Sequence, residues 1–190
     1  VREAEIPTIA ITNTNPLVTK NNPYYFRVCY VDSYQGIALA KYAAEELGQQ
    51  KAAVLKPKND DVAAALSSAF EDKFTQLTGD SEAAAAVLEY DSGAESFAEP
   101  LEEIRKSGAR VVFLPASATD GVKIIREARK AGLPITFLGT EAWDTQSFAE
   151  AIGDASGMAV FSSMYDPDIQ ANPTTEKFLA AYREKYGEDA

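Results

Sequence analysis

The stretch RVVFLPASATDGVKIIREARKAGLPITFLG, residues 110–139, decides the fold of this chain. It begins and ends with apolar runs, RVVFLP (110–115) and ITFLG (135–139), that are typical of buried strands. Between them, residues 120–130 carry apolar side chains every three or four positions and stop before Gly132, which is the pattern of an amphipathic helix. A strand, a helix and a second strand in this order predict parallel strands joined by a crossover helix.

The same alternation continues on both sides of this unit. Further strands are predicted at 6–11, 25–31, 52–55, 84–90 and 157–163. Further helices are predicted at 33–48, with Ser33 as the N-cap, and at 60–77, 96–106, 145–152 and 175–186. Because the strands are continuously apolar, helices should cover both faces of the sheet. We therefore expect an α/β fold with a parallel sheet in three αβα layers.

The composition excludes several classes of function. The 190 residues include 29 acidic and 18 basic side chains, for a net charge of −11, so a nucleic-acid partner is not expected. No apolar run approaches the roughly 20 residues of a membrane span, so we expect no membrane insertion of this segment. The chain has no histidine and neither glycine-rich phosphate motif, so we expect no catalytic residue, no metal site and no cofactor.

Polar side chains follow the predicted strands, and parallel sheets bind ligands at that edge. Glu141 and Trp143 follow the strand at 135–139. Glu141 is either a solvated loop carboxylate or the counter-charge for a ligand ammonium, which Trp143 would then shield from water. Thr12 and Thr14 form either a simple hydroxyl-bearing turn or a site for a ligand carboxylate.

An acidic phosphoacceptor domain is an alternative reading of the same edge. Asp60 and Asp61 follow one strand, and Asp120 follows another. That class also needs an acidic pair after its first strand, an acceptor aspartate after its third and a lysine after its fifth, and no order of these strands supplies all of them. Cys29, the only cysteine, lies within a strand pattern and is expected to be buried and inert.

Three long stretches together resemble the branched-chain amino-acid-binding proteins, the leucine/isoleucine/valine-binding family of type I periplasmic solute receptors of ABC importers. They are TNTNPLVTKNNPYYFRVCYVDSYQGIALAKYAAEELGQQKAAVL (12–55), ARVVFLPASATDGVKIIREARKAGLPITFLGTEAWD (109–144) and SSMYDPDIQANPTTEKFLAAYREKYG (162–187). The resemblance implies two α/β lobes of the type I periplasmic-binding-protein fold, with the ligand between them. It also implies that this chain is a fragment of such a receptor.

The resemblance implies three segments. Residues 1–31 would be the last part of the first lobe and a linker, residues 32–163 a complete second ligand-binding lobe, and residues 164–190 a crossover and a helix that return toward the first lobe.

The resemblance also assigns six ligand-binding residues. Thr12 and Thr14 match the turn that binds the ligand carboxylate, Glu141 matches the acid that receives the ammonium, and Trp143 matches an aromatic residue beside the site. Relatives often carry a tyrosine where this chain has Asp61, and aromatic residues where it has Ser117 and Ala118. These departures favour a roomier or more polar site than one for a branched aliphatic ligand.

The function implied by the resemblance is that of an extracytoplasmic receptor, not an enzyme, for an amino acid or amide. Its expected partner is an ABC transporter permease. Its expected location is periplasmic or extracellular, with a lipid anchor on the full-length protein as one way of holding it there. The alternatives are a ligand-binding sensory module of a receptor or transcription regulator, and an enzyme on an α/β sheet, which the lack of histidine disfavours.

Overall fold

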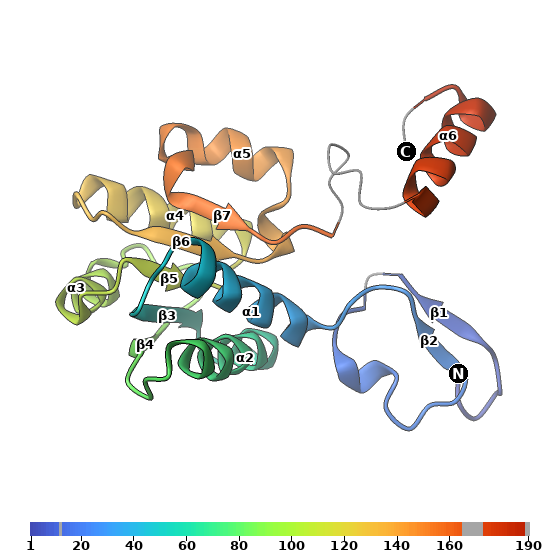
Figure 1. Cartoon of the computed structure of the whole chain (residues 1–190), viewed down its shortest axis with the longest axis horizontal. Helices are drawn as coiled ribbons and strands as arrows, with labels where there is room; N and C mark the ends of the chain where they lie inside the picture. Colours follow the sequence, from blue (N-terminus) through green and yellow to red (C-terminus); the bar gives the residue numbers. More distant parts are fainter. Residues whose placement is uncertain (12, 165–172, 189–190) are drawn as a thin grey trace.

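The computed structural model of the chain describes residues 1–11, 13–164 and 173–188 (Figure 1). The strands are β1 (Thr8–Ala10), β2 (Tyr25–Arg27), β3 (Ala52–Pro57), β4 (Ala84–Tyr90), β5 (Val111–Phe113), β6 (Thr136–Gly139) and β7 (Ala159–Phe161). The α-helices are α1 (Asp32–Lys41), α2 (Asp61–Thr78), α3 (Ala98–Ser107), α4 (Ala118–Lys130), α5 (Gln146–Ile152) and α6 (Pro173–Tyr186). Short 3-10 turns occupy Pro16–Val18 (η1), Glu141–Trp143 (η3) and Gly153–Met158 (η4), and a π-helical turn occupies Tyr42–Glu46 (η2).

Five of the strands form one sheet in the order β4-β3-β5-β6-β7, and every neighbouring pair is parallel. Each crossover between successive strands of this sheet carries a helix, as parallel pairing requires. The sheet and its helices confirm the predicted α/β fold with three αβα layers.

Each face of the sheet is buried against its own set of helices, because successive side chains of a strand point to opposite faces. On one face, Val54 and Phe113 pack against α1 and α2, and Phe70 stacks on Phe113 with ring centroids 4.7 Å apart. On the other face, Leu55 and Phe137 pack against α3, α4 and α5. This two-sided burial explains why the strands read as continuously apolar.

Helices α1 and α2 touch through their backbones at Gly36. A Cβ atom at this position would lie 2.5 Å from the carbonyl oxygen of Leu66 and 3.0 Å from the backbone nitrogen of Phe70. Both of these atoms belong to α2, so neither can move aside as a side chain does. The glycine is therefore required for this close packing of the two helices.

The N-terminal segment lies apart from the five-stranded sheet (Figure 1). Its two strands, β1 and β2, pair in parallel with Ile9 opposite Phe26, and Val28 continues the pairing through its backbone N–H to Ala10. The C-terminal helix α6 has no buried residue among those described. The boundaries predicted at residues 31/32 and 163/164 remain predictions.

Two local predictions were wrong in an informative way. Ser33 does not cap the first helix, because α1 already begins at Asp32 after Val31, and no side-chain cap bond is present there. The strand predicted at 25–31 ends at Arg27, because its partner β1 ends at Ala10, whose carbonyl accepts the last pairing bond, from Val28 N–H. Pro100 lies in the first turn of α3, where the missing backbone N–H of proline is tolerated.

Among the helices that the structure describes, none combines the length and the apolar character needed to cross a membrane.

Candidate functional site

The carboxyl edge of the sheet brings together the loops that carry three of the predicted site residues. The strand order reverses between β3 and β5, since β3 is followed in sequence by β4 on one side and β5 lies on the other. Open parallel sheets bind ligands in the crevice beyond such a reversal. Asp61 follows β3, Ser117 follows β5, and Glu141 follows the neighbouring strand β6.

Asp61 and Ser117 are exposed at this edge. Asp61 is the first residue of α2, whose N-cap is the preceding Asp60 with its carboxylate accepting from Ala63 N at 2.9 Å. The Ser117 hydroxyl caps α4 by accepting from Asp120 N at 3.2 Å, which leaves its own proton free to donate. Both side chains are thus polar groups held at helix starts.

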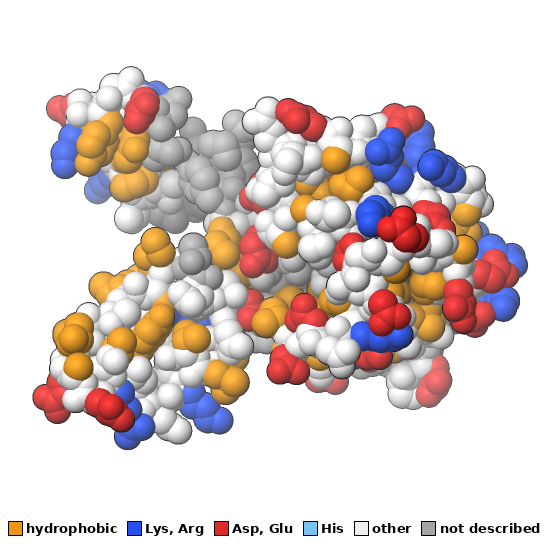
Figure 2. All heavy atoms as spheres, turned by 180° about the vertical axis from the view of Figure 1, so that it is seen from behind, with side chains coloured by type: hydrophobic (Ala, Val, Ile, Leu, Met, Phe, Trp, Pro, Cys, Tyr) orange, Lys and Arg blue, Asp and Glu red, His pale blue; other side chains and the backbone are white. Residues whose placement is uncertain are grey.

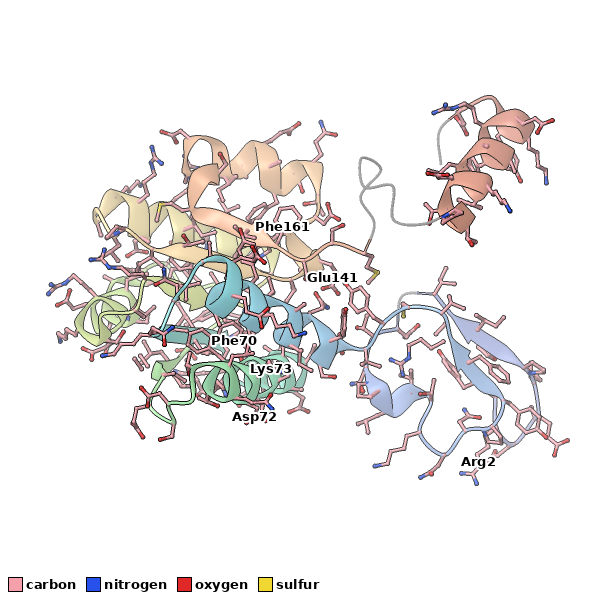
Figure 3. The ribbon with its side chains drawn as sticks, in the orientation of Figure 1. Arg2, Phe70, Asp72, Lys73, Glu141 and Phe161 are labelled. Carbon is pink, nitrogen blue, oxygen red and sulfur yellow. The ribbon has the colours of Figure 1, made fainter. Side chains whose placement is uncertain are left out.

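Glu141 is held in place by its backbone. The strand β6 ends at Gly139, Thr140 caps the turn η3, and Glu141 begins that turn. Its backbone N–H donates to the amide oxygen of Gln35 at 3.3 Å. The side chain is half-buried, and Figure 3 shows it at the end of the sheet that faces the N-terminal segment.

Three buried polar atoms near this turn have no hydrogen-bond partner among the described residues: the Tyr30 hydroxyl, Gln35 Nε2 and Glu141 Oε2. Burial, and after it the negative charges of Glu141 and Asp32, together raise the pKa of Tyr30 to about 12. The charge of Glu141 therefore acts on the Tyr30 hydroxyl, while Glu141 Oε2 lacks a hydrogen-bond donor among the described residues.

Trp143 lies inside the lobe rather than over the site. Its side chain has no exposed surface, stacks on Phe148 and donates from Nε1 to the carbonyl oxygen of Ala116 at 3.0 Å. It fits there because Gly121 and Gly139 leave room, and a Cβ at Gly139 would lie 2.2 Å from the ring. The indole thus joins the loop of Ser117 to the turn of Glu141 from within, and its predicted contact with a ligand stays a prediction.

The hydroxyl-bearing turn is organised by Arg27. Its guanidinium donates to the carbonyl oxygens of Asn13, Thr14 and Asn15 at 3.0, 2.6 and 3.0 Å, and to the Thr19 hydroxyl at 2.9 Å. The Thr14 carbonyl also accepts from Asp32 N at 3.1 Å. Thr14 is therefore tied to the start of α1 and lies beside a fixed positive charge. Thr12 lies outside the described residues.

Sequence reasoning missed Arg27, Tyr30 and Gln35. Arg27 and Tyr30 were read only as parts of a strand, and their partners lie outside any local pattern. Gln35 bonds to residues 106 and 127 positions away, which no periodicity reveals. The sequence held a usable signal only for the interior position of Trp143. Gly121 lies in the interior of α4, where glycine costs about 1 kcal/mol relative to alanine and therefore needs a packing reason.

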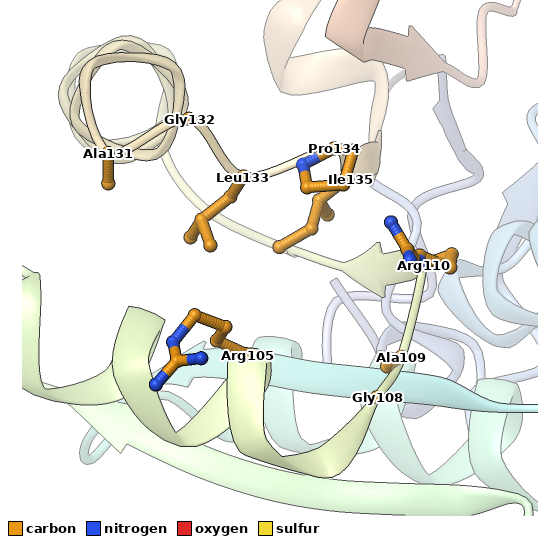
Figure 4. Close-up of a pocket in the computed structure, with 9 residues that line it drawn as sticks. All are labelled: Arg105, Gly108, Ala109, Arg110, Ala131, Gly132, Leu133, Pro134 and Ile135. Carbon is orange, nitrogen blue, oxygen red and sulfur yellow. The ribbon is translucent and has the colours of Figure 1, made fainter.

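A separate hollow of about 290 Å³ lies at the opposite, amino edge of the sheet, between the end of α3 and the chain entering β5 and β6 (Figure 4). Its polar lining is dominated by Arg105 and Arg110, but Arg105 already forms two bonds to Glu102, at 2.6 and 2.7 Å. No group of three or more metal-ligating side chains occurs in the described part of the chain. The carboxyl edge therefore remains the better candidate.

A profile of the periplasmic binding protein family matches residues 1–190. The chain also superposes on the leucine-binding protein LivK from Thermotoga maritima, with 29% identity and a TM-score of 0.82 over 99% of this chain and 53% of that one. It superposes on the branched-chain amino acid transporter protein LivJ from Streptococcus pneumoniae, solved with isoleucine, with 22% identity and a TM-score of 0.79 over 98% and 52% of the two chains.

A third solved structure, a solute-binding protein of R. palustris in complex with benzoate, shows 23% identity and a TM-score of 0.75 over 99% of this chain and 51% of that one. The chain thus spans about half the length of the solved relatives that it matches. A search of curated protein sequences found no match.

Proposed function

The chain belongs to the periplasmic binding protein family, and from this membership we propose that it forms the second lobe and the linkers of an extracytoplasmic solute receptor of an ABC importer. The proposed ligand is an amino acid or an amino-acid-like small molecule, bound without covalent chemistry between two lobes. The 29% identity to a leucine-binding protein supports this class of ligand.

The observation that carries the proposal is the state of the Glu141 carboxylate. One of its oxygens is buried and has no hydrogen-bond donor among the described residues. A buried acceptor without a donor is unfavourable by about 1–3 kcal/mol, and more when the group is charged. A ligand ammonium would supply both the missing donor and the opposite charge, at the edge of the sheet where ligands bind.

The Arg27 turn supports a complementary role at the other end of the ligand. The guanidinium holds three consecutive carbonyl groups and so places a positive charge behind Thr14. Positive potential and a hydroxyl group favour a carboxylate. A negative site at Glu141 and a positive turn at Thr14 together suit a ligand with both an ammonium and a carboxylate group.

Asp61 and Ser117 bear on the rest of the ligand. Both are exposed polar residues beside the strand-order reversal, Asp61 as the first residue of α2 and Ser117 as the N-cap of α4. Short polar side chains leave more room than aromatic rings and offer hydrogen bonds to a polar ligand group. We propose a small polar or amide-bearing amino acid rather than a branched aliphatic one.

Closure of two lobes would give the site its selectivity. We propose that the lobes rotate about residues 30–34 and 162–167, of which 165–167 lie outside the described residues. Closure would exclude water and strengthen the pairing at Glu141. The proposed permease would then receive the ligand from a receptor that is periplasmic or extracellular. Because half of such a site would come from the other lobe, we expect the 190-residue chain alone to bind weakly or not at all.

The test is calorimetry and thermal shift with amino acids and small amides on a full-length receptor that contains this chain. An amino acid that binds should raise the melting temperature, by mass action. Glu141→Gln keeps the shape and removes the charge, so affinity should fall by roughly 10- to 100-fold.

Glu150→Gln is the matched control, because Glu150 is an exposed glutamate of α5 whose partner is the nearby Gln146. This variant should bind as the wild type does. Equal affinities of the wild type and Glu141→Gln would remove Glu141 from the site. Micromolar binding by the 190-residue chain would contradict the need for a second lobe.

A further inference from the structure

Gln35 makes contacts that its position in the sequence does not suggest. It lies in the first turn of α1, only 2% exposed. Its amide oxygen accepts one hydrogen bond from Glu141 N at 3.3 Å and another from the Ser162 hydroxyl at 2.6 Å. One buried side chain therefore joins three separate parts of the chain.

The orientation of the amide follows from its partners. The backbone N–H of Glu141 can only donate, so the group that faces it must be the amide oxygen. A serine hydroxyl rotates freely and can donate to the same oxygen. The amide nitrogen then faces away from both, and it has no partner among the described residues. The oxygen is the end of the side chain that makes the contacts.

The three joined points have different roles in the chain path. Gln35 follows the linker by which the chain enters the five-stranded lobe, and Ser162 follows β7, where the chain leaves it. Glu141 is the candidate acid. Figure 3 shows Glu141 and the end of β7 at the same end of the lobe, facing the N-terminal segment.

We propose that Gln35 is a positioning residue. It couples the segment by which the chain enters the lobe, before α1, and the segment by which it leaves, after β7, to the backbone of Glu141. In this arrangement, a change of angle at either linker shifts the acid through the shared amide oxygen. The inference rests on the proposed function for the importance of Glu141, but the coupling itself is a property of the ligand-free chain. It can therefore be tested without any ligand.

The variants separate this role from simple packing. Gln35→Met fills a similar volume and accepts neither bond. Gln35→Glu restores an acceptor oxygen, and Ser162→Ala removes one of the two donors without touching Glu141. Gln49→Met is the matched control, because the side-chain amide of Gln49 hydrogen-bonds, among the described residues, only to the nearby Leu47 carbonyl.

The readout is the hydrogen-exchange rate of the Glu141 amide, measured by NMR on the 190-residue chain. In Gln35→Met we expect exchange to be roughly fivefold to tenfold faster, with recovery in Gln35→Glu and no change in Gln49→Met. Ser162→Ala should also change the Glu141 rate or its chemical shift, and it should have no further effect in the Gln35→Met background.

A Glu141 amide that is indifferent to Ser162→Ala would overturn the coupling, and this holds even if Gln35→Met does not fold. Equal effects of Ser162→Ala in both backgrounds would overturn it as well, because the signal would then bypass Gln35. Loss of ligand binding in the full-length receptor would count against the proposed function alone and leave these rates unaffected.

Discussion

The five-stranded lobe and the N-terminal β1–β2 pair use apolar residues in opposite ways. In the lobe, Phe70, Phe113 and Phe137 have no exposed surface. In the N-terminal segment, Ile9, Ile11 and Val28 are 63%, 70% and 71% exposed, and Ala10 is the only buried residue among those described before residue 32. Figure 2 shows the hydrophobic side chains gathered on this segment, at the lower left.

This difference shows which part of the chain has its own core. Ile9 and Phe26 are paired across β1 and β2 and so lie on one face of the strand pair. The exposed side chains of Ile11 and Val28 follow directly beyond the two strands. A contiguous exposed apolar face is typical of an interaction surface. The lobe should therefore account for the stability of the chain, and the strand pair should add little to it.

The largest expected effect contrasts two phenylalanines. Phe113→Ala should lower the free energy of unfolding by about 3–5 kcal/mol, because it opens a cavity beneath α2. Phe26→Ala should change it by less than about 0.5 kcal/mol, because this ring is already 54% exposed. Urea unfolding of the 190-residue chain measures both. Similar losses in the two variants would mean that the strand pair belongs to the same cooperative core.

A substitution at Gly139 next tests how closely Trp143 fits beneath the candidate site. Gly139→Ala places a methyl group 2.2 Å from Trp143 and should cost about 1–3 kcal/mol through overpacking. Because Trp143 is the only tryptophan, its displacement should also shift the fluorescence emission to longer wavelength.

Gly157→Ala is the control for this substitution, because a Cβ atom there meets no atom within 4 Å in the part of the chain that the structure describes. An unshifted emission spectrum in Gly139→Ala would contradict the described fit of the indole.

The next effect concerns alkaline pH. Tyr30 should keep its proton up to a pKa of about 12 in the folded chain and lose it near 10 in the unfolded chain. The contribution of protonated Tyr30 to the free energy of unfolding is therefore complete below pH 10 and is lost as the pH rises from about 10 to about 12. The wild type should lose more stability than Tyr30→Phe between pH 9 and pH 11, measured by urea unfolding at each pH.

Tyr186→Phe, which alters an exposed tyrosine of α6, is the control and should show the wild-type pH dependence. A parallel loss in the wild type and Tyr30→Phe would show that the burial of Tyr30 is not coupled to folding.

The smallest effect on stability is expected on the exposed face of the strand pair. Ile9→Thr should change the free energy of unfolding by less than about 0.5 kcal/mol. It should reduce concentration-dependent association, because it removes part of the apolar face. Light scattering across a range of concentrations measures this association. The comparison between the two regions would be wrong if Ile9→Thr lowered the free energy of unfolding and left association unchanged. The strand pair would then belong to the core, and its apolar face would not be an interaction surface.

The sheet was predictable because local patterns determine it. The strands at 84–90 and 135–139 and the helix at 60–77 each carry their own apolar repeat, and the structure places strands or a helix at β4, β6 and α2. The ends of some strands could not be predicted from the local pattern, because they depend on pairing with a distant strand. Residues 28–31 read as strand, but β2 stops where β1 stops.

The candidate site was predictable only in its edge. The rule that ligands meet the carboxyl ends of strands pointed to Asp61 and Glu141, and the family resemblance added Ser117. The structure has all three at that edge, at the starts of α2, η3 and α4. The rule could not find Gln35 or Arg27, because their bonds depend on how distant loops come together. It also could not decide between a surface and an interior place for Trp143, because that depends on room left by Gly121 and Gly139.

The direct backbone contact at Gly36 has a mechanical consequence. Because no side chain separates α1 and α2 at Gly36, their backbones are in direct contact and cannot shift past each other easily. Helix α2 is in turn packed on the sheet through the stacked rings of Phe70 and Phe113. A pull on the chain just before α1 should thus move helices and sheet together as one solid body. Under load, elastic strain would then collect in the short segment before Asp32 instead of spreading through the lobe.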